Sequence, residues 1–271
     1  MGRIIAFTNQ KGGVGKTTTC VNVSAYMALM GKKVLLIDID QQGNATTGLG
    51  IDKTKEDLVT IYDVISENAE IDKAIYKTEI EGLDIIPANI DLAGAEPELV
   101  YVKERESVLK KVLAKIKNSY DYITIDCPPS LGQLTVNALT ASDGVIIPIQ
   151  CEFFALEGLS QLMNTIRLVK KIGLNPSLSV DGVVLTMRDT RSNLGRQVAE
   201  EIGKFFGSTV FSTTIPRNIR LAECPSYGQP IYLYDKTCVG SIAYLKLVEE
   251  YFDRNNVQYK KLTRKKDNKK I

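Results

Sequence analysis

The segment TNQKGGVGKTT, residues 8–18, follows a short apolar run at residues 3–8 and precedes a helical pattern over about residues 16–30. Closely spaced glycines allow the backbone to fold around an anion, so that successive N–H groups and the N-terminus of the helix point at it. The order of strand, glycine-rich loop and helix therefore predicts a phosphate-binding loop. The alternative is a glycine-rich turn with incidental lysines, and the order of the three elements argues against it.

The loop also supplies groups that suit a magnesium–nucleotide site. Lys16 places a positive charge where the β- and γ-phosphates are expected, and the hydroxyl of Thr17 is suited to coordinate Mg²⁺. The spacing differs from the common GxxxxGK[ST] pattern, because the first glycine position falls at Asn9 or Gln10 and Lys11 begins a tighter GGVGK core. We therefore expect a nucleotide and Mg²⁺ to bind here.

Two other predicted strands end in acidic residues that fit the same site. The apolar run at residues 122–126 ends in Asp126, as expected for a carboxylate near the metal. The run at residues 35–40 ends in Asp38 and Asp40, and residues i and i+2 of an extended chain point to the same side. We expect Asp38 to face Mg²⁺ and Asp40 to face the attacking water. Acidic residues at strand ends also form N-caps and turns, and this alternative stays open.

Short β-branched runs alternate with helical patterns along the chain. The runs are continuously apolar, as in strands buried on both faces, and predict strands at residues 3–8, 33–38, 83–87, 122–126, 144–149, 179–186 and 209–214. Further helices are expected over residues 96–117 and about 156–172. This order predicts an α/β fold with a single doubly wound, mostly parallel sheet, helices on both faces, and ligands at the carboxyl ends of the strands.

Histidine is absent from the 271 residues, which excludes several kinds of site within this chain. A Ser-His-Asp or Cys-His nucleophile, an HExxH zinc site and an imidazole general base all need it. The five cysteines are scattered without a CxxC pair, so neither a disulfide framework nor a Cys-rich metal site is expected. Because no apolar run is long enough to cross a bilayer, we expect a cytoplasmic protein.

The formal net charge of +2 is unevenly distributed along the chain. Residues 260–271, KKLTRKKDNKKI, hold seven of the 34 basic residues and one of the 32 acidic residues, which leaves the rest of the chain with a net charge of −4. Such a run is most often a solvated end, and it is also suited to bind nucleic acid or an anionic membrane surface. We therefore divide the chain into one domain, residues 1–255, and a basic, flexible tail, residues 256–271.

Taken together, these motifs resemble the ParA/Soj partition ATPases, which belong to the deviant Walker A group of phosphate-loop proteins together with MinD and the nitrogenase iron protein. The resemblance covers nearly all of residues 3–253. Its marks are TNQKGGVGKTT (8–18), DxDxQGNAT (38–46), IDCPPSLG (125–132), CEFFALEGLSQL (151–162) and IPRNIRLAECPSYGQPI (215–231). One departure is Gln41, where the family usually has proline; because proline fixes φ, its loss is expected to loosen this segment and to affect the hydrolysis rate.

The resemblance implies a slow, Mg²⁺-dependent ATPase that forms a homodimer when ATP lies between two subunits. It implies that Lys11 reaches the partner's phosphates, that Gly12 lies where the subunits approach, and that Asp40 positions the water. Catalysis is thereby assigned to Lys11, Lys16 and Asp40, and the metal to Thr17, Asp38 and Asp126. The nucleotide is assigned to Lys11, Gly12, Gly13, Val14, Gly15, Lys16, Thr17, Thr18 and Glu152, with Pro216 and Asn218 at the adenine.

The resemblance also implies two macromolecular partners, non-specific double-stranded DNA and a ParB-type centromere-binding protein that stimulates hydrolysis over the nucleoid. Arg191 and Arg220 match positions used for DNA binding in Soj-like relatives, and surface solvation or a local ion pair is the alternative for both. The accessory DNA contacts are expected from the tail residues Lys260, Lys261, Arg264, Lys265 and Lys266.

Two other functions use the same ATP-binding chemistry. A MinD-like membrane-cycling ATPase needs an amphipathic C-terminal helix, but after Tyr259 the only aliphatic residues are Leu262 and Ile271, so no stable membrane anchoring is expected. A metabolic phosphate-loop enzyme that phosphorylates or amidates a small molecule needs a substrate pocket beyond the γ-phosphate, and no cluster of residues in the sequence indicates one.

Overall fold

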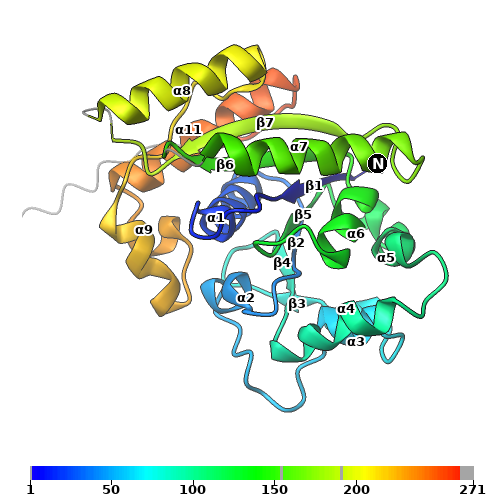
Figure 1. Ribbon diagram of the computed structural model, residues 1–271. Coiled ribbons are helices and arrows are strands. Elements are labelled where there is room, and N and C mark those ends of the chain that lie inside the picture. Colours follow the sequence, from blue (N-terminus) through cyan, green and yellow to red (C-terminus); the bar gives the residue numbers. More distant parts are fainter. Residues whose placement is uncertain (1, 153–154, 190–191, 263–271) are drawn as a thin grey trace, which may run out of the picture.

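A seven-stranded sheet forms the centre of the computed structural model, which describes residues 2–152, 155–189 and 192–262 (Figure 1). The strand order is β3-β4-β2-β5-β1-β6-β7, and only the pairing of β3 with β4 is antiparallel. This confirms the predicted doubly wound, mostly parallel sheet. The strands are β1 (Arg3–Phe7), β2 (Val34–Asp38), β3 (Tyr76–Lys77), β4 (Leu83–Ile86), β5 (Tyr122–Asp126), β6 (Gly144–Gln150) and β7 (Ser179–Thr186).

Helices cover both faces of this sheet, and their hydrophobic sides complete three clusters of buried side chains. The helices are α1 (Lys16–Leu29), α2 (Asn44–Gly48), α3 (Ile61–Ile65), α4 (Ala95–Leu99), α5 (Val108–Ala114), α6 (Gln133–Ala141), α7 (Ala155–Lys171), α8 (Asn193–Phe206), α9 (Ile219–Glu223), α10 (Ile231–Asp235) and α11 (Val239–Arg254). Short 3-10 helices join several of them, among them Cys224–Tyr227, which follows α9 directly.

Strand β2 shows why the strands read as continuous apolar runs. Val34 and Leu36 pack into the cluster that contains α1 and α11, whereas Leu35 and Ile37 pack into the cluster that contains α3 to α6. Successive side chains of a strand point to opposite faces, so a strand covered on both faces needs an apolar residue at every position.

The predicted helix over residues 96–117 is wrong as a single element. The structure has α4 and α5 there, and they are separated by residues 100–107, within which Glu104 has a φ of 55°. Leu99, Leu109 and Leu113 are all buried in one cluster, which explains the helical spacing. A left-handed residue interrupts a right-handed helix, so the two helices reach the same core separately.

The predicted strand over residues 209–214 is also wrong, because this segment makes only an isolated bridge between Val210 and Val183 of β7. The N–H groups of Ser212 and Thr213 donate to the carboxylate of Glu250 on α11, at 2.7 and 2.8 Å. A side chain therefore takes the donors that a strand would use for its ladder. The short edge strand β3, which pairs with β4, was not predicted from the sequence.

The segment after α11 folds back toward the end of α1. Val257, Tyr259 and Leu262 pack against the core, and the N–H of Lys260 donates to the carbonyl of Met30 at 3.0 Å. Residues 263–271 lie outside the described part of the chain, so the division at residue 255 and the flexible tail stay predictions. Among the described helices, none has the length and the apolar composition needed to span a membrane.

Candidate nucleotide-binding site

The glycine-rich loop joins β1 to α1 at the carboxyl edge of the sheet (Figure 1). Gly13 and Gly15 have φ values of 73° and 82°, a conformation that residues with a side chain rarely adopt. Helix α1 begins at Lys16 without a side-chain cap and without an acidic residue in its first turn. Its first N–H groups therefore remain available to an anion, as the sequence predicted.

Lys16 points into the loop. Its side chain is buried, and Nζ donates to the carbonyl of Lys11 at 3.2 Å. Burial lowers the pKa of the Lys16 amine, and the nearby carboxylates of Asp126 and Asp40 oppose that shift. The loop thus encloses a cationic group whose present hydrogen bond is to a neutral carbonyl oxygen.

Asp126 is the least satisfied charged side chain of the site. It is fully buried at the end of β5, and neither carboxylate oxygen has a hydrogen-bond partner among the described residues. Burial raises the pKa of Asp126 well above its ordinary value, and Asp38 raises it further; Thr17 and Lys16 lie close enough to oppose the increase. A buried carboxylate without a partner is costly, and a cation removes that cost.

The residues present fit a magnesium–nucleotide complex. Among the described residues, no group of three His, Cys, Asp or Glu side chains forms a site for a bare metal ion. Mg²⁺ is commonly held by one or two protein oxygens together with phosphate oxygens and water, which matches Thr17 beside the unpaired Asp126. The metal assignments of Thr17, Asp38 and Asp126 stay predictions.

Asp38 has the same burial as Asp126 but different surroundings. Strands β2 and β5 pair in register, so that Asp38 lies opposite Asp126. One oxygen of Asp38 accepts the N–H of Asp40 at 3.1 Å, and the other accepts the N–H and the hydroxyl of Thr46 at 2.9 and 2.8 Å. Burial raises the pKa of Asp38 to about 6, and the bonds from Thr46 oppose that increase.

Asp40 follows in a tight turn at the carboxyl end of β2. Its side chain is buried, and Oδ1 accepts the N–H of Gln42 at 3.0 Å. The N–H of Gly43 donates to the Asp40 carbonyl at 2.8 Å, whereas Gln41, where the family usually has proline, is exposed. The structure therefore brings Asp38, Asp40 and Asp126 to one edge of the sheet, as the sequence predicted.

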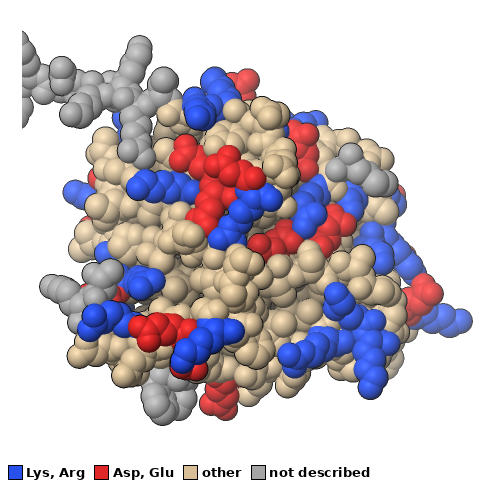
Figure 2. All heavy atoms as spheres, turned by 90° about the horizontal axis from the view of Figure 1, so that it is seen from above, with Lys and Arg blue, Asp and Glu red and all other residues tan. Residues whose placement is uncertain are grey.

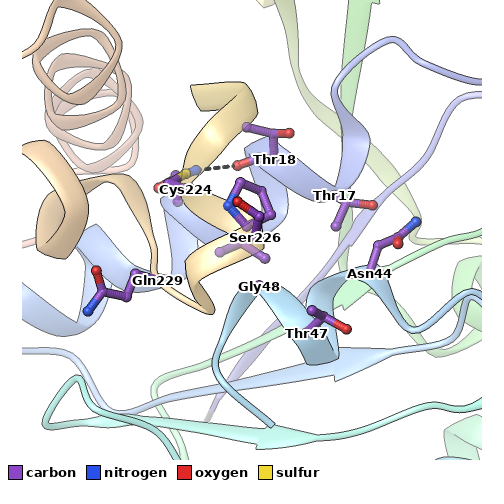
Figure 3. Close-up of a pocket in the computed structure, with 11 residues that line it drawn as sticks. Thr17, Thr18, Asn44, Thr47, Gly48, Cys224, Ser226 and Gln229 are labelled. Atoms are coloured by element: carbon purple, nitrogen blue, oxygen red, sulfur yellow. Dashed lines mark hydrogen bonds between the residues drawn. The ribbon is translucent and has the colours of Figure 1, made fainter. Parts of the chain in front are cut away.

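A cavity of about 380 Å³ separates α1, α2 and the 3-10 helix after α9 (Figure 3). Thr17 and Thr18 of α1 and Asn44 and Thr47 of α2 line it, and Ser226 faces them from the third element. None of its lining residues is charged. This cavity was not predicted from the sequence.

A second cavity, of about 430 Å³, shares Thr18 with the first and is lined by Gly13, Gly15 and residues 215–219, 221 and 222. Pro216 and Asn218, which the resemblance places at the adenine, both line it. Oδ1 of Asn218 is buried without a hydrogen-bond partner among the described residues, so it is free to accept a bond from an amino group.

Sequence reasoning missed Thr186 as a residue of this site. Its hydroxyl donates to the carbonyl of Val14 at 2.8 Å and so ties the loop to the end of β7. The available signal was its position, because Thr186 is the last residue of a predicted strand whose carboxyl end faces the ligand edge.

Lys11 and Glu152 form an ion pair within this chain, with 2.6 Å between Nζ and Oε2. The other Glu152 oxygen accepts the side-chain amide of Gln150 at 2.5 Å. Both charged side chains are partly exposed, and exposed pairs contribute little to stability. The family resemblance implies that both residues reach a partner's nucleotide, and that expectation stays a prediction.

The predicted DNA-binding residues are only partly within the described chain. Arg220 lies on α9 and forms an ion pair with Glu223 at 3.1 Å. Arg191, Arg264, Lys265 and Lys266 lie outside the described residues, whereas Lys260 and Lys261 are exposed at the end of the chain that the structure describes. Figure 2 shows one face of the molecule, on which acidic and basic side chains lie together in several places among uncharged residues, and basic side chains predominate at the lower right.

Comparisons with known proteins agree on the kind of protein to which this chain is similar. The AAA domain family matches residues 2–180. The chain is 59% identical over 250 residues to the sporulation initiation inhibitor protein Soj of Bacillus subtilis (strain 168), covering 92% of this chain and 98% of Soj. It is 52% identical over 254 residues to the chromosome partitioning protein ParA of Caulobacter vibrioides (strain NA1000 / CB15N), covering 93% of this chain and 94% of ParA.

Among solved structures, the chain is similar to cobyrinic acid a,c-diamide synthase from Mycobacterium smegmatis with bound ADP and magnesium. The identity is 37%, the TM-score is 0.81, and the match covers 97% of this chain and 100% of that one.

Proposed function

The chain belongs to the Soj/ParA family of chromosome-partitioning ATPases, and from that premise we propose that it is an ATP-dependent, dimeric DNA-binding switch in chromosome or plasmid partition. Its cofactors are ATP and Mg²⁺. The single observation that carries the proposal is the buried, unpaired carboxylate of Asp126 beside Lys16 and Thr17. Such a group is stabilised by a bound cation, and it lies where a phosphate loop holds its nucleotide.

Each residue of the site has a distinct task in the proposed ATP hydrolysis. The N–H groups of the loop and Lys16 hold the phosphates, while Thr17, Asp38 and Asp126 face the metal. Bound Mg²⁺ neutralises charge on the phosphate oxygens. Asp40 orients the attacking water, and Lys11 of the partner subunit adds positive charge at the phosphoryl group being transferred.

Dimer formation links hydrolysis to DNA binding in this proposal. Lys11 and Glu152 exchange their mutual ion pair for contacts across two nucleotides, which joins two copies of the chain. The dimer doubles the number of arginines at positions 191 and 220 that face DNA phosphates, and salt-sensitive affinity rises with the number of such contacts. A ParB-type protein stimulates hydrolysis and so releases the DNA. Because the ATP-bound dimer binds DNA, the proposed location of the protein is the cytoplasm, on the nucleoid.

A DNA retardation assay with ATP, with ADP and without nucleotide tests the switch. We expect binding to random-sequence DNA in ATP only, and its affinity to fall steeply as salt rises. The Lys16→Ala variant in ATP is the matched control and is expected to behave like the nucleotide-free protein. Equal DNA binding in all three nucleotide conditions would contradict the proposal.

Two alternatives give different outcomes in the same set of assays. A MinD-like membrane-cycling ATPase would sediment with anionic liposomes in ATP without binding DNA. An amidating enzyme, a candidate because of the similarity to the synthase structure, would hydrolyse ATP only when cobyrinic acid and a nitrogen donor are added to the assay. We expect DNA and a ParB-type partner, rather than liposomes or these small molecules, to accelerate hydrolysis.

A further inference from the structure

Thr46 stands at the centre of a buried chain of hydrogen bonds that ends at Asp40. The N–H of Ala88, just beyond β4, donates to the Thr46 hydroxyl oxygen at 2.9 Å. The same hydroxyl donates to Asp38 at 2.8 Å, and the other oxygen of Asp38 accepts the N–H of Asp40 at 3.1 Å. Thr46, Asp38 and Ala88 are all fully buried, so water does not compete for these bonds.

The direction of each bond in this chain is determined by its donors. A backbone N–H only donates, so the Thr46 oxygen accepts from Ala88 and must use its own proton toward Asp38. The hydroxyl therefore accepts one hydrogen bond and donates another, and its orientation is fixed. Hydrogen bonds in a buried series strengthen one another, and they join the ends of β4 and β2 to the first turns of α2.

The chain of bonds adds a side-chain anchor to a segment that is otherwise held mainly by backbone bonds, from the N–H of Ile39 to the Asp126 carbonyl at 3.0 Å and from the N–H of Gly43 to the Asp40 carbonyl at 2.8 Å. Gln41 and Gln42 are exposed, and α2 begins after Gly43 without a side-chain cap. Gln41 also lacks the fixed φ that a proline would bring to this position. The backbone of Asp40 is anchored to the protein interior by Asp38, and Asp38 is oriented in turn by Thr46.

We propose that Thr46 is a positioning residue for hydrolysis, which acts through Asp38 to hold Asp40 in position beside the γ-phosphate. This rests on the proposed role of Asp40 in orienting water. Of the residues assigned to the nucleotide and the metal, only Asp38 is hydrogen-bonded to Thr46, and Asp38 keeps the N–H bonds from Thr46 and Asp40 when the hydroxyl is lost. Loss of the hydroxyl therefore slows the chemical step and leaves ATP affinity unchanged.

Single-turnover hydrolysis and equilibrium ATP binding by Thr46→Val test this directly. Valine keeps the shape of threonine and its N–H, but it removes the hydroxyl. We expect the hydrolysis rate to fall about tenfold, because displacements below 1 Å at a reacting group have effects of this order, while the dissociation constant for ATP stays within about twofold. Thr46→Ser restores the hydroxyl and is expected to recover most of the rate.

Thr47→Val is the matched control on the same helix. Its hydroxyl donates to the carbonyl of Gly43 at 3.1 Å, within its own turn, and the side chain lines the cavity between α1 and α2 (Figure 3). We expect hydrolysis by Thr47→Val to stay within about twofold of the unchanged protein, since this bond does not reach Asp38 or Asp40.

An equal loss of rate in Thr46→Val and Thr47→Val, or no loss in either, overturns the proposal. Thr46→Ala repeats the comparison with Thr46→Ser if Thr46→Val does not fold. Asp40→Ala separates the two hypotheses: normal hydrolysis by that variant removes Asp40 from its role, whereas a stalled Asp40→Ala with a fully active Thr46→Val overturns only the inference about Thr46.

Discussion

The ends of β2 and β5 lie side by side, and each carries a fully buried aspartate, yet the two regions differ in how their polar groups are satisfied. On the β2 side, Asp38 accepts three hydrogen bonds from Asp40 and Thr46. On the β5 side, Asp126 accepts none from the described residues, and the neighbouring Lys16 is bonded to a neutral carbonyl. In the first region, residues 38–46, folding supplies the hydrogen-bond partners of the buried aspartate. In the second region, the loop with Asp126, only a ligand supplies a partner.

This difference follows from the cost of burying polar groups. A buried carboxylate that accepts several hydrogen bonds replaces most of the hydrogen bonding that it had with water. An unpaired buried carboxylate loses that hydrogen bonding without replacement. The hydrogen bonds of the folded protein therefore hold residues 38–46 rigidly. In the loop region the burial of the unpaired Asp126 costs free energy, and binding of a nucleotide with its cation offsets that cost. Four predictions test the contrast, from the largest effect to the smallest.

Replacement of Lys16 by alanine should have the largest effect, because it removes the cation that the loop region offers to phosphates. We expect ATP affinity to fall about 100-fold, since a charge-assisted bond to phosphate contributes on the order of 1.5–3 kcal/mol. Nucleotide titration by calorimetry measures this. Lys53→Ala, which removes an amine bonded to the Gln42 carbonyl in the other region, is the control and should leave the affinity nearly unchanged.

The same substitution at the two aspartates should separate the regions in the absence of nucleotide. Asp38→Ala leaves three donors of Asp40 and Thr46 without an acceptor, whereas Asp126→Ala removes no hydrogen bond among the described residues. We expect Asp38→Ala to lower the free energy of unfolding by about 2 kcal/mol more than Asp126→Ala does. Chemical denaturation measures both, and equal destabilisation would remove the contrast.

The pH dependence of stability should also reveal the buried pair. Burial raises the folded-state pKa of Asp38 to about 6 and that of Asp126 in the same direction, so the folded protein binds protons more tightly than the unfolded chain. The Asp38 contribution is complete below about pH 4 and is lost as pH rises through about 6, and the Asp126 contribution is lost as pH rises through its own raised pKa. Relative to Asp126→Asn, the nucleotide-free protein should lose stability as pH rises from 4.5 to 7.

Thermal unfolding at a series of pH values measures this loss. Saturating Mg²⁺ and ATP should flatten the dependence, because a cation beside the carboxylates favours their charged form. If the difference in stability between the unchanged protein and Asp126→Asn does not change with pH, burial does not raise the pKa of Asp126 and the prediction is wrong.

Removal of the Lys11–Glu152 pair should have the smallest effect on folding. Both side chains are partly exposed, so Glu152→Ala should change the free energy of unfolding by less than about 0.5 kcal/mol. Glu157→Ala, an exposed acid in the first turn of α7, is the control. If Glu152→Ala, but not Glu157→Ala, lowers the free energy of unfolding by more than about 1 kcal/mol, the Lys11–Glu152 pair stabilises the fold, as the bonds around Asp38 do, and the prediction is wrong.

The sequence was sufficient for most of the strands, for helix α1 and for the phosphate loop, because these depend on residues close together in the chain. It failed where local spacing fits two structures. Leu99 and Leu109 lie in the same core although Glu104 breaks the helix between them. In the run at residues 209–214, Glu250, a side chain nearly 40 residues away, accepts two of the backbone N–H groups, and the N–H of Phe211 still donates to Val183 of β7.

By itself, the sequence determined that a glycine loop, a lysine and three aspartates meet at one edge of a parallel sheet. It treated Asp38 and Asp126 alike, since each ends an apolar strand. Only the tertiary structure decided that Asp38 is satisfied and Asp126 is not. The physical reason is that the turn after β2 packs the Thr46 N–H and hydroxyl onto Asp38, and Ala88, which the sheet brings in from just beyond β4, fixes the direction of that hydroxyl. No donor among the described residues is bonded to Asp126.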